Sequence, residues 1–411
     1  MPVTCQVKPK LTRPLQAATL ALNGGLVHDP VTQAIAPNIA MSVNHAFAPG
    51  DGAFSADGMA DLTALPFLYA GWTNPTVRQL ELRMAALEGA DDAFATASGT
   101  AAANAVFFSF LKAGDHLIIS DVCYAGVHEL ACKLLPDYGI EVSTANLSRL
   151  EDVAAAIRPN TRLIHAESPC NPLLRLTDLA ALAELTRVRG ILLVVDSTFA
   201  TPVATCPLAL GADLVVHSLT KFINGHGDAL GGCVAGRKDL VARIRSRAGV
   251  YFGAALSAQN AWLIMRGIDT LFPRMQAMSA SASKIAAFLQ AHPAVSSVIY
   301  PGLVSHPQHA LAQRQMRVPG ALIIFQVRDP QAVAQRLAQD AAVFDYAFSI
   351  GHQRSLVVLL NTQDLLQSTF TLTPAQLADY RRYAGDGVLR LSIGLEDPQD
   401  LIDDLDRALT P

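Results

Sequence analysis

The chain has 411 residues, of which 51% are hydrophobic and 16% charged, and its formal net charge is −4. At about 150 residues per domain, this length predicts two or three domains, and the composition excludes a disordered chain, which would be rich in charge and poor in apolar residues. Acidic and basic residues are interspersed, which argues against a nucleic-acid or acidic-membrane partner.

The first 62 residues carry proline and glycine turn signals and no clear periodicity, so we predict an N-terminal arm over 1–62. The apolar stretch Leu15–Leu22 imitates a signal peptide only weakly, because Pro14 precedes it and glycines end it early. No apolar run approaches the ~18 residues of a membrane span. The six cysteines form no C-x-x-C pair, so we expect no metal site and a reducing, cytoplasmic setting.

Residues 63–256 carry the pattern of an α/β domain, because short β-type runs alternate with helical periodicity between Glu81 and Arg247. The run Ile191–Val195 is apolar throughout, as strands buried on both faces are. Strands that alternate with helices predict a mainly parallel sheet covered by helices. The predicted strands are Ala93–Thr96, His116–Ser120, Glu141–Thr144, Arg162–Ala166, Ile191–Val195, Leu214–His217 and Gly232–Ala235.

One intervening helix is predicted over Leu176–Val188, where leucines recur every three residues. We expect Thr177 to cap its beginning and Gly190 to end it.

The pattern changes at Ser257, where long helical stretches precede fewer and more scattered strands. We therefore predict a smaller α+β domain over 257–411. Its predicted elements are helices over Ala258–Gly267 and Met275–His292 and strands over Val295–Tyr300, Ala321–Val327 and Val388–Ile393.

Asp196 directly follows the apolar run Ile191–Val195, which puts a carboxylate at the carboxyl end of a buried strand, the usual ligand edge of such sheets. A buried carboxylate needs a cationic partner. The alternative is a structural one, in which Asp196 caps the following turn at Ser197–Thr198.

Lys221 follows the hydroxyl residues Ser218 and Thr220 and opens a glycine-rich stretch over residues 225–232. A lysine beside a buried sheet end can lose its proton, and the neutral amine can then react with a carbonyl group. The alternative is a surface lysine, the commonest place for this residue type.

Together these segments resemble the pyridoxal-phosphate enzymes of cysteine and methionine metabolism, which include cystathionine γ-synthases, cystathionine γ-lyases, methionine γ-lyases and O-acylhomoserine sulfhydrylases. The resemblance runs in order through nearly the whole chain. It implies the PLP-dependent transferase fold (aspartate-aminotransferase-like, fold type I), with a seven-stranded mainly parallel sheet in a PLP-binding domain and a smaller α+β C-terminal domain. The matching motifs are Tyr69…Asn74-Pro75-Thr76, Ala97-Ser98-Gly99, Glu167-Ser-Pro-Cys-Asn-Pro172, Val194-Val-Asp-Ser-Thr-Phe-Ala-Thr-Pro202, the stretch from Pro207 to Lys221, Leu263-Ile-Met-Arg-Gly-Ile-Asp-Thr270 and Arg390-Leu-Ser-Ile-Gly-Leu-Glu-Asp397.

The resemblance implies pyridoxal 5'-phosphate as the cofactor. Lys221 would bind it covalently and later shuttle protons, and Asp196 would pair with the pyridinium nitrogen. Its phosphate would lie at the positive N-terminus of a helix over Ala101–Leu111. The residues implied at the phosphate are Ser98, Gly99, Thr100, Ser218, Thr220 and, reaching into a neighbouring subunit, Tyr69.

The resemblance also assigns the residues around the ring and the substrate. Tyr124 would stack on the ring and act near the leaving group, and Asn171 would lie beside the ring hydroxyl. Arg390 would bind the substrate α-carboxylate through its planar fork, with Ser349 as a further residue of the site. A homotetramer built from two dimers with shared active sites is the oligomer that the family implies.

Four positions depart from the family pattern or bear on the substrate. Gly71 stands where the family usually has arginine, and we expect Gly71→Arg to raise cofactor affinity. Gly126 stands where methionine γ-lyases carry cysteine, and Phe348 where cystathionine-processing lyases carry glutamate, so neither substrate is favoured. Arg354 is interpreted as a surface residue, with a contact to a distal acidic group as the alternative.

Three functions follow from the resemblance. The first is a γ-lyase that removes the γ-substituent of an L-amino acid, either methionine-like or an O-substituted homoserine such as a guanidinooxy compound. It would yield a 2-oxo acid or a homoserine-type product, with ammonia or the leaving group. The second is a γ-replacement enzyme, a cystathionine γ-synthase or O-acylhomoserine sulfhydrylase. The third is a cofactor-binding protein with little turnover, which Gly71 brings into consideration.

Overall fold

The structure is a computed structural model that describes residues 14–26, 28–29, 32–51, 55–56, 59 and 61–410. Two compact units make up the described chain. Unit 1 contains the described residues up to Ser109, then 214–224 and 228–272, and unit 2 contains 110–213, 225–227 and the described residues from Pro273 on. The boundaries predicted after residues 62 and 256 remain a prediction.

A seven-stranded sheet has the order β1-β7-β6-β5-β4-β2-β3. The pairs β2–β3, β2–β4 and β4–β5 are parallel, whereas β7 runs antiparallel to both β1 and β6. The prediction of a mainly parallel seven-stranded sheet is confirmed, and each predicted strand agrees with an observed one to within a residue at either end. The strands are β1 (Asp92–Thr96), β2 (His116–Ser120), β3 (Glu141–Ala145), β4 (Thr161–Glu167), β5 (Leu192–Asp196), β6 (Leu214–Ser218) and β7 (Gly232–Gly236).

Unit 1 combines β1, β6 and β7 with helices from both ends of its sequence. Helix α2 (Pro75–Glu88) begins at Asn74, whose side-chain oxygen accepts the N–H groups of Thr76 and Val77. The arm contains a short helix that the sequence pattern does not predict, α1 (Ala17–Asn23), which packs against α2 and α9. The remaining helices are α8 (Lys238–Ile244), α9 (Ala258–Asp269) and most of α3 (Gly99–Phe110).

The arm residues 35–47 are tied to the rest of unit 1 through polar atoms of their backbone. Pro37 O accepts the indole N–H of Trp262 at 3.0 Å, and Ala40 O accepts the Asn74 amide at 2.8 Å. Most of the large hydrophobic side chains of this stretch are exposed, among them Ile35 and Met41 at 80% and 68%.

The part of unit 2 that contains β2, β3, β4 and β5 has a core of aliphatic residues from these strands and from α5 (Leu150–Ala156) and α6 (Leu179–Arg187). The cap predicted for α6 is wrong by one residue. Asp178 caps the helix, because its carboxylate accepts the N–H of Ala181 at 3.1 Å, while Thr177 lies before the first turn. Two further short helices are α4 (Ala125–Glu129), which continues as a π-helix over Leu130–Leu134, and α7 (Thr201–Ala204).

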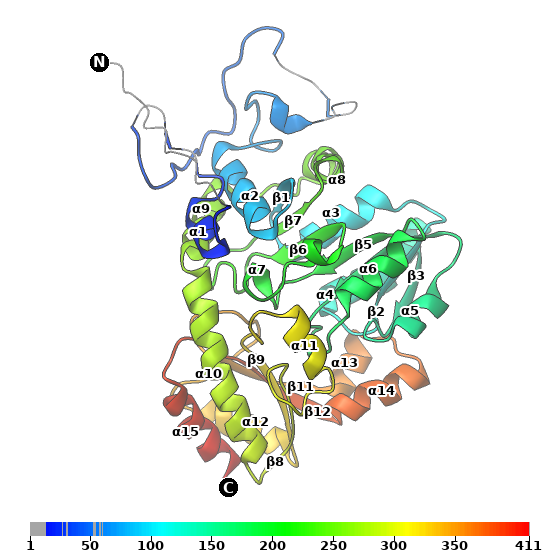
Figure 1. Cartoon of the computed structure of the whole chain (residues 1–411), viewed down its shortest axis with the longest axis vertical. Helices are drawn as coiled ribbons and strands as arrows, with labels where there is room; N and C mark the ends of the chain where they lie inside the picture. The colour runs from blue at the N-terminus through cyan, green and yellow to red at the C-terminus, as the bar shows by residue number, and fades with distance from the viewer. Residues whose placement is uncertain are drawn as a thin grey trace. The chain divides into compact units, whose positions relative to one another are not determined.

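The C-terminal part of unit 2 is a five-stranded sheet of order β10-β11-β12-β9-β8 with helices beside it, visible in the lower half of Figure 1. Its core joins β9, β11 and β12 to α10, α12 and α15, which confirms the smaller α+β domain. The strands are β8 (Val295–Ile299), β9 (Leu322–Val327), β10 (Asp345–Tyr346), β11 (Leu356–Asn361) and β12 (Gly387–Ser392). The helices are α10 (Leu271–Ala291), α11 (His309–Gln315), α12 (Pro330–Asp340), α13 (Thr362–Ser368), α14 (Pro374–Ala384) and α15 (Pro398–Leu409).

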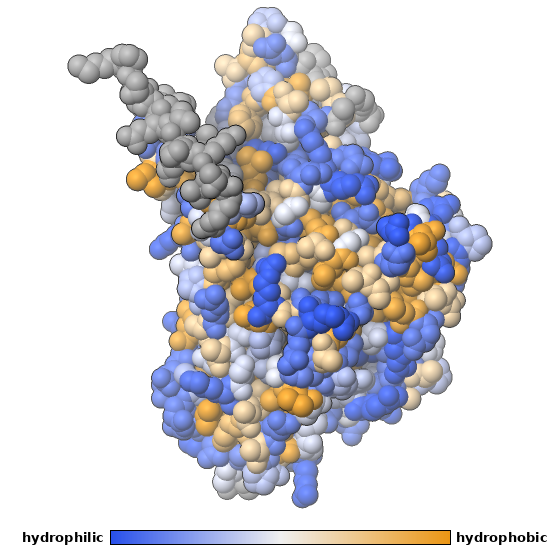
Figure 2. Space-filling view, in the orientation of Figure 1, coloured by the Kyte–Doolittle hydropathy of each residue, from blue (hydrophilic) through white to orange (hydrophobic). Residues whose placement is uncertain are grey.

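None of the helices that the described residues form is long and apolar enough to cross a membrane. On the face shown in Figure 2, hydrophobic residues lie among hydrophilic ones.

Candidate functional site

Unit 1 brings together the residues predicted to hold a phosphate. Helix α3 begins at Gly99, and Ser98 closes its first turn by accepting the N–H of Ala101 on Oγ and that of Ala102 on its carbonyl oxygen, both at 3.1 Å. The N–H groups of Gly99 and Thr100 lie in the first turn, where a helix supplies no acceptor of its own. They form the positive end of a 12-residue helix.

The end of β6 lies directly against this helix start. A β-carbon at position 99 would lie 2.7 Å from Ser218 Cβ, and one at position 232 would lie 2.1 Å from the Ser98 carbonyl oxygen. Only glycine permits both approaches. The hydroxyl of Ser218 therefore joins the backbone donors of α3, and this donor set suits an anion such as phosphate.

Lys221 lies in the turn that follows β6, and its N–H donates to Ser218 O at 3.2 Å. The Thr220 hydroxyl accepts the N–H of Gly231 at 3.0 Å and donates to Gly231 O at 3.2 Å. This pair of bonds ties the lysine-bearing turn to the beginning of β7. Because the one hydroxyl proton of Thr220 is donated to Gly231 O, the structure gives this residue a structural role, and its contact to a phosphate remains a prediction.

In unit 2, two carboxylates end neighbouring parallel strands. Glu167 of β4 pairs in register with Asp196 of β5, and both side chains are buried. Asp196 Oδ1 accepts the N–H of Thr198 at 2.9 Å, so the capping role considered as an alternative is present as well. Burial, followed by the neighbouring charge of Asp196, raises the pKa of Glu167 well above its ordinary value.

Glu167 contacts two of the predicted site residues, although the sequence pattern assigned it no role of its own. Its Oε2 accepts the N–H of Tyr124 at 2.8 Å, and its Oε1 accepts the N–H of Asn171 at 2.6 Å. One carboxyl group thus fixes the backbone of two predicted site residues. The available signal was its place directly after an apolar strand, at the head of the Glu167–Pro172 motif.

Arg390 lies in the middle of β12 and is buried. Its Nη1 donates to Asn171 Oδ1 at 2.9 Å and its Nη2 to Ser349 O at 3.3 Å, and both of these acceptors are neutral. Burial lowers the pKa of Arg390 to about 10, which leaves it charged at neutral pH. A buried cation held by neutral acceptors suits an incoming carboxylate.

Ser349 adopts φ 89°, a left-handed conformation that is rare for residues other than glycine. This strained residue presents its carbonyl oxygen to Arg390. Strain of this kind persists only where the surrounding structure fixes it, and it concentrates at functional sites.

Tyr124 begins helix α4, and 45% of its surface is exposed. Its ring lies over Gly126, because a β-carbon at position 126 would lie 2.8 Å from Tyr124 Cε1 and 3.2 Å from its hydroxyl oxygen. Gly126 therefore leaves room for the observed position of the phenol, which a side chain at this position would displace.

A similar relation joins Tyr69 and Gly71 in unit 1. A β-carbon at position 71 would lie 2.6 Å from Tyr69 Cε1, so the substitution Gly71→Arg requires the Tyr69 ring to rotate. Tyr69 is exposed, as are Phe348 and Arg354 of unit 2. The structure thus gathers the phosphate residues within unit 1 and the residues Tyr124, Asn171, Ser349 and Arg390 within unit 2.

The comparisons with known proteins all find related enzymes. The sequence profile described as Cys/Met metabolism PLP-dependent enzyme matches residues 18–410. Canavanine gamma-lyase of Pseudomonas canavaninivorans is 42% identical over 402 residues, which covers 96% of each chain. O-succinylhomoserine sulfhydrylase of Pseudomonas aeruginosa is 42% identical over 346 residues, covering 83% of each chain. The solved structure of cystathionine gamma-lyase from Lactobacillus plantarum, complexed with L-serine, matches with a TM-score of 0.85 at 32% identity, covering 96% of this chain and 98% of that one.

Proposed function

Because this chain belongs to the Cys/Met metabolism family of pyridoxal-phosphate-dependent enzymes, we propose that it is a γ-lyase acting on an O-substituted L-homoserine with a guanidinooxy leaving group, that is, canavanine. The observation that carries this proposal is the 42% identity to a canavanine gamma-lyase over 96% of both chains. The sulfhydrylase relative has the same identity but covers 83% of this chain.

The residues present fit the cofactor. Ser98, Gly99, Thr100 and Ser218 offer backbone and hydroxyl donors to its phosphate, and Lys221 follows them in the chain. In the proposal Asp196 would pair with the ring nitrogen, and Lys221 would bind the aldehyde carbon. When bound, pyridoxal phosphate would supply an electron sink that allows protons to leave Cα and then Cβ of the substrate.

Arg390 binds the substrate α-carboxylate in this proposal. A substrate carboxylate would give this buried guanidinium the anionic partner that Asn171 and Ser349, as neutral acceptors, do not provide. This contact supports a carboxylate-bearing substrate, as an α-amino acid is.

Tyr124 is proposed to protonate the leaving oxygen as the bond between Cγ and oxygen breaks. Hydroxyguanidine is then the leaving group. One water completes the reaction, either by giving a 2-oxo acid and ammonia or by replacing the leaving group at Cγ to give homoserine. The apolar and 76% exposed Phe348 offers no partner to a distal ammonium group, which disfavours cystathionine.

A γ-replacement enzyme is the second candidate, because O-succinylhomoserine sulfhydrylase is as similar in identity over the part that aligns. A cofactor-binding protein with little turnover is the third, since Gly71 cannot supply the charged phosphate contact of an arginine.

A substrate screen with the purified holoenzyme separates the three candidates. We expect canavanine to be consumed without any thiol, with hydroxyguanidine released together with keto acid and ammonia or homoserine, and no turnover by a Lys221→Ala control. Turnover of O-succinylhomoserine only after a thiol is added would support the replacement enzyme instead. Cofactor absorbance that changes with none of canavanine, methionine or O-succinylhomoserine would support the third candidate.

We further propose a homotetramer of two dimers with shared sites, located in the cytoplasm. The exposed hydrophobic side chains of arm residues 35–47 support a second copy of the chain as the partner of this surface, because exposed apolar stretches are usually covered. The described cysteines form no disulfide with one another, which supports a reducing compartment.

A further inference from the structure

Two short segments of unit 2 carry Tyr124 and Asn171. The first, Asp121–Tyr124, links β2 to α4, and the second, Ser168–Arg175, follows β4. The work proposed for Tyr124 and Asn171 requires that the two segments keep a fixed separation.

One bridge between these segments is Glu167, whose two carboxyl oxygens accept the N–H groups of Tyr124 and Asn171. This bridge fixes the backbone at one point in each segment. A single fixed point leaves each segment free to rotate about it. The orientation of the two segments therefore requires a second contact.

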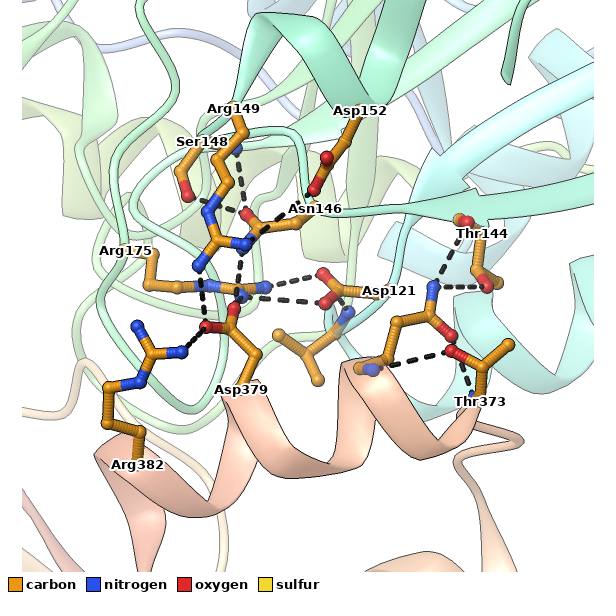
Figure 3. A network of polar contacts seen from close by, with 12 residues as sticks. Asp121, Thr144, Asn146, Ser148, Arg149, Asp152, Arg175, Thr373, Asp379 and Arg382 are labelled. Atoms are coloured by element: carbon orange, nitrogen blue, oxygen red, sulfur yellow. Dashed lines mark hydrogen bonds and ion pairs between the residues drawn. The ribbon is translucent and has the colours of Figure 1, made fainter. Parts of the chain in front are cut away.

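Arg175 makes the second contact, at the far ends of the same two segments. Its Nη2 binds Asp121 Oδ1, and its Nη1 lies 3.4 Å from Asp121 Oδ2, so the fork holds both carboxylate oxygens. Figure 3 shows Arg175 and Asp121 facing one another with two dashed contacts between them. This planar pairing fixes orientation as well as distance.

Helix α14 supplies a second carboxylate to the same guanidinium. Asp379 Oδ2 lies 3.4 Å from Arg175 Nη1 and accepts the Asn146 amide at 2.8 Å. Figure 3 shows Asp379 on the helix below Arg175, with Arg149 and Arg382 on its other sides. A C-terminal helix is thereby attached to the two segments that carry the site residues.

The central three groups are buried: Asp121, Arg175 and Asp379 each expose 5% or less of their surface. A buried ion pair contributes little net stability, because desolvation offsets most of the attraction. Such a network fixes one geometry of its side chains, because each buried charged group has few alternative hydrogen-bond partners.

The segment that Arg175 anchors is also strained. Leu174 adopts φ 53°, which non-glycine residues rarely do, and Cys170 N donates to Arg175 O at 2.9 Å across the turn. A strained turn keeps its conformation only when its neighbours hold it. The Arg175 side chain is one such constraint, and Asn171 lies inside the turn it closes.

We propose that Arg175, held between Asp121 and Asp379, is a positioning residue that sets the separation and orientation of Tyr124 and Asn171. This inference rests on the proposed function, which gives those two residues their roles. Arg175 itself need not touch the substrate or cofactor.

The kinetic test compares Arg175→Lys and Asp379→Asn with Arg382→Gln. The first keeps the charge and loses the fork, the second removes one of the two carboxylates, and the control removes an exposed arginine that binds the same Asp379. We expect Arg175→Lys to lower kcat about tenfold with little change in KM, because small displacements of reacting groups cost this much. Asp379→Asn should lower kcat less, and Arg382→Gln should leave it unchanged.

A second measurement does not depend on turnover. Cys123 adjoins Tyr124 and Cys170 adjoins Asn171, while Cys233 lies in β7 of unit 1; all three thiols are buried, and burial raises their pKa. Labelling the apoenzyme with N-ethylmaleimide and mapping the peptides should show Cys123 and Cys170 reacting about tenfold faster in Arg175→Lys, through local opening, while Cys233 stays protected.

The outcomes are distinct. Wild-type kcat together with wild-type labelling of Cys123 and Cys170 in Arg175→Lys would overturn the proposal. Equal acceleration at Cys233 would show a global loss of stability and would also overturn it. If the wild-type enzyme turned over none of the amino acids in the screen, the proposed function would fail, and the labelling pattern would still decide whether Arg175 holds the two segments.

Discussion

At the scale of single residues, Gly126 leaves the room that the phenol of Tyr124 occupies. The ring lies so close to Gly126 that a β-carbon there would be 2.8 Å from Cε1 and 3.2 Å from the hydroxyl oxygen. Contacts below 3.0 Å force something to move, and the half-exposed ring is the part that can. A side chain at position 126 therefore acts on the proposed proton donor and not on the backbone.

We expect Gly126→Ala to lower kcat roughly tenfold by displacing the Tyr124 hydroxyl. Tyr124→Phe should lower it about a hundredfold, as loss of a general acid does. The measurement is a double-mutant cycle on kcat, and the alanine should cost much less in the Tyr124→Phe background. The same factor in both backgrounds would contradict an effect that runs through the phenol.

Most of the candidate site residues were identifiable from sequence because they occupy strand ends and motif positions, as Asp196 and Lys221 do. Glu167 was not assigned a role because its contacts are to backbone N–H groups 43 and 4 residues away, which no side-chain pattern reveals. Arg175 was not assigned one either, because its partner Asp379 lies 204 residues away in the sequence.

At the scale of elements, most strands of the larger sheet were predictable because they are short runs buried along most of their length, as β1, β2 and β5 are. Helix α1 was not, because its seven residues show too few turns for a periodic pattern. The α6 cap was misplaced because Thr177 and Asp178 are both capping residues, and sequence alone does not decide between neighbours.

One carboxylate of helix α15 binds the backbone that leads to the Phe348–Ser349 segment. Asp404 is buried and accepts the N–H groups of Ala342, Val343 and Phe344 at 3.0, 2.6 and 3.2 Å. These three residues lead from α12 into β10, just before Phe348. A single side chain thus satisfies three backbone donors at the rim of the smaller sheet.

Asp404→Asn should lower the free energy of unfolding by about 2–4 kcal/mol, because an amide offers one acceptor oxygen and no charge to these donors. Its neighbour Asp403 provides the control, because it is exposed and its carboxylate accepts a hydrogen bond from Gln399 of the same helix. Asp403→Asn should change stability by less than about 0.5 kcal/mol. Urea unfolding of the apoenzyme, followed by circular dichroism, measures both. Equal midpoints for the two variants would refute the role of Asp404.

At the scale of the whole molecule, the composition and the arm point to association. Charged residues make up only 16% of the chain, and interfaces between subunits are depleted in charge at their centres. The arm exposes hydrophobic side chains while its backbone is bonded to unit 1. Tyr69, at 52% exposure, adjoins the same stretch through its bridge to Asn44.

If each active site contains residues of two subunits, mixing two inactive variants should restore activity, which a monomeric enzyme could not do. If Tyr69 of one subunit serves the cofactor bound at Lys221 of the next, Tyr69→Ala and Lys221→Ala are each inactive or nearly so alone. In a mixed dimer, however, one site carries both changes and the other carries none. Refolding the two variants together in equal amounts should therefore restore about a quarter of wild-type activity, since half of the dimers are mixed and each has one intact site.

Mixing Lys221→Ala with Asp196→Asn is the control, because both residues are proposed to serve the cofactor of their own subunit, so no intact site can form. Activity no greater than that of the separate variants would show that Tyr69 does not serve a neighbouring subunit.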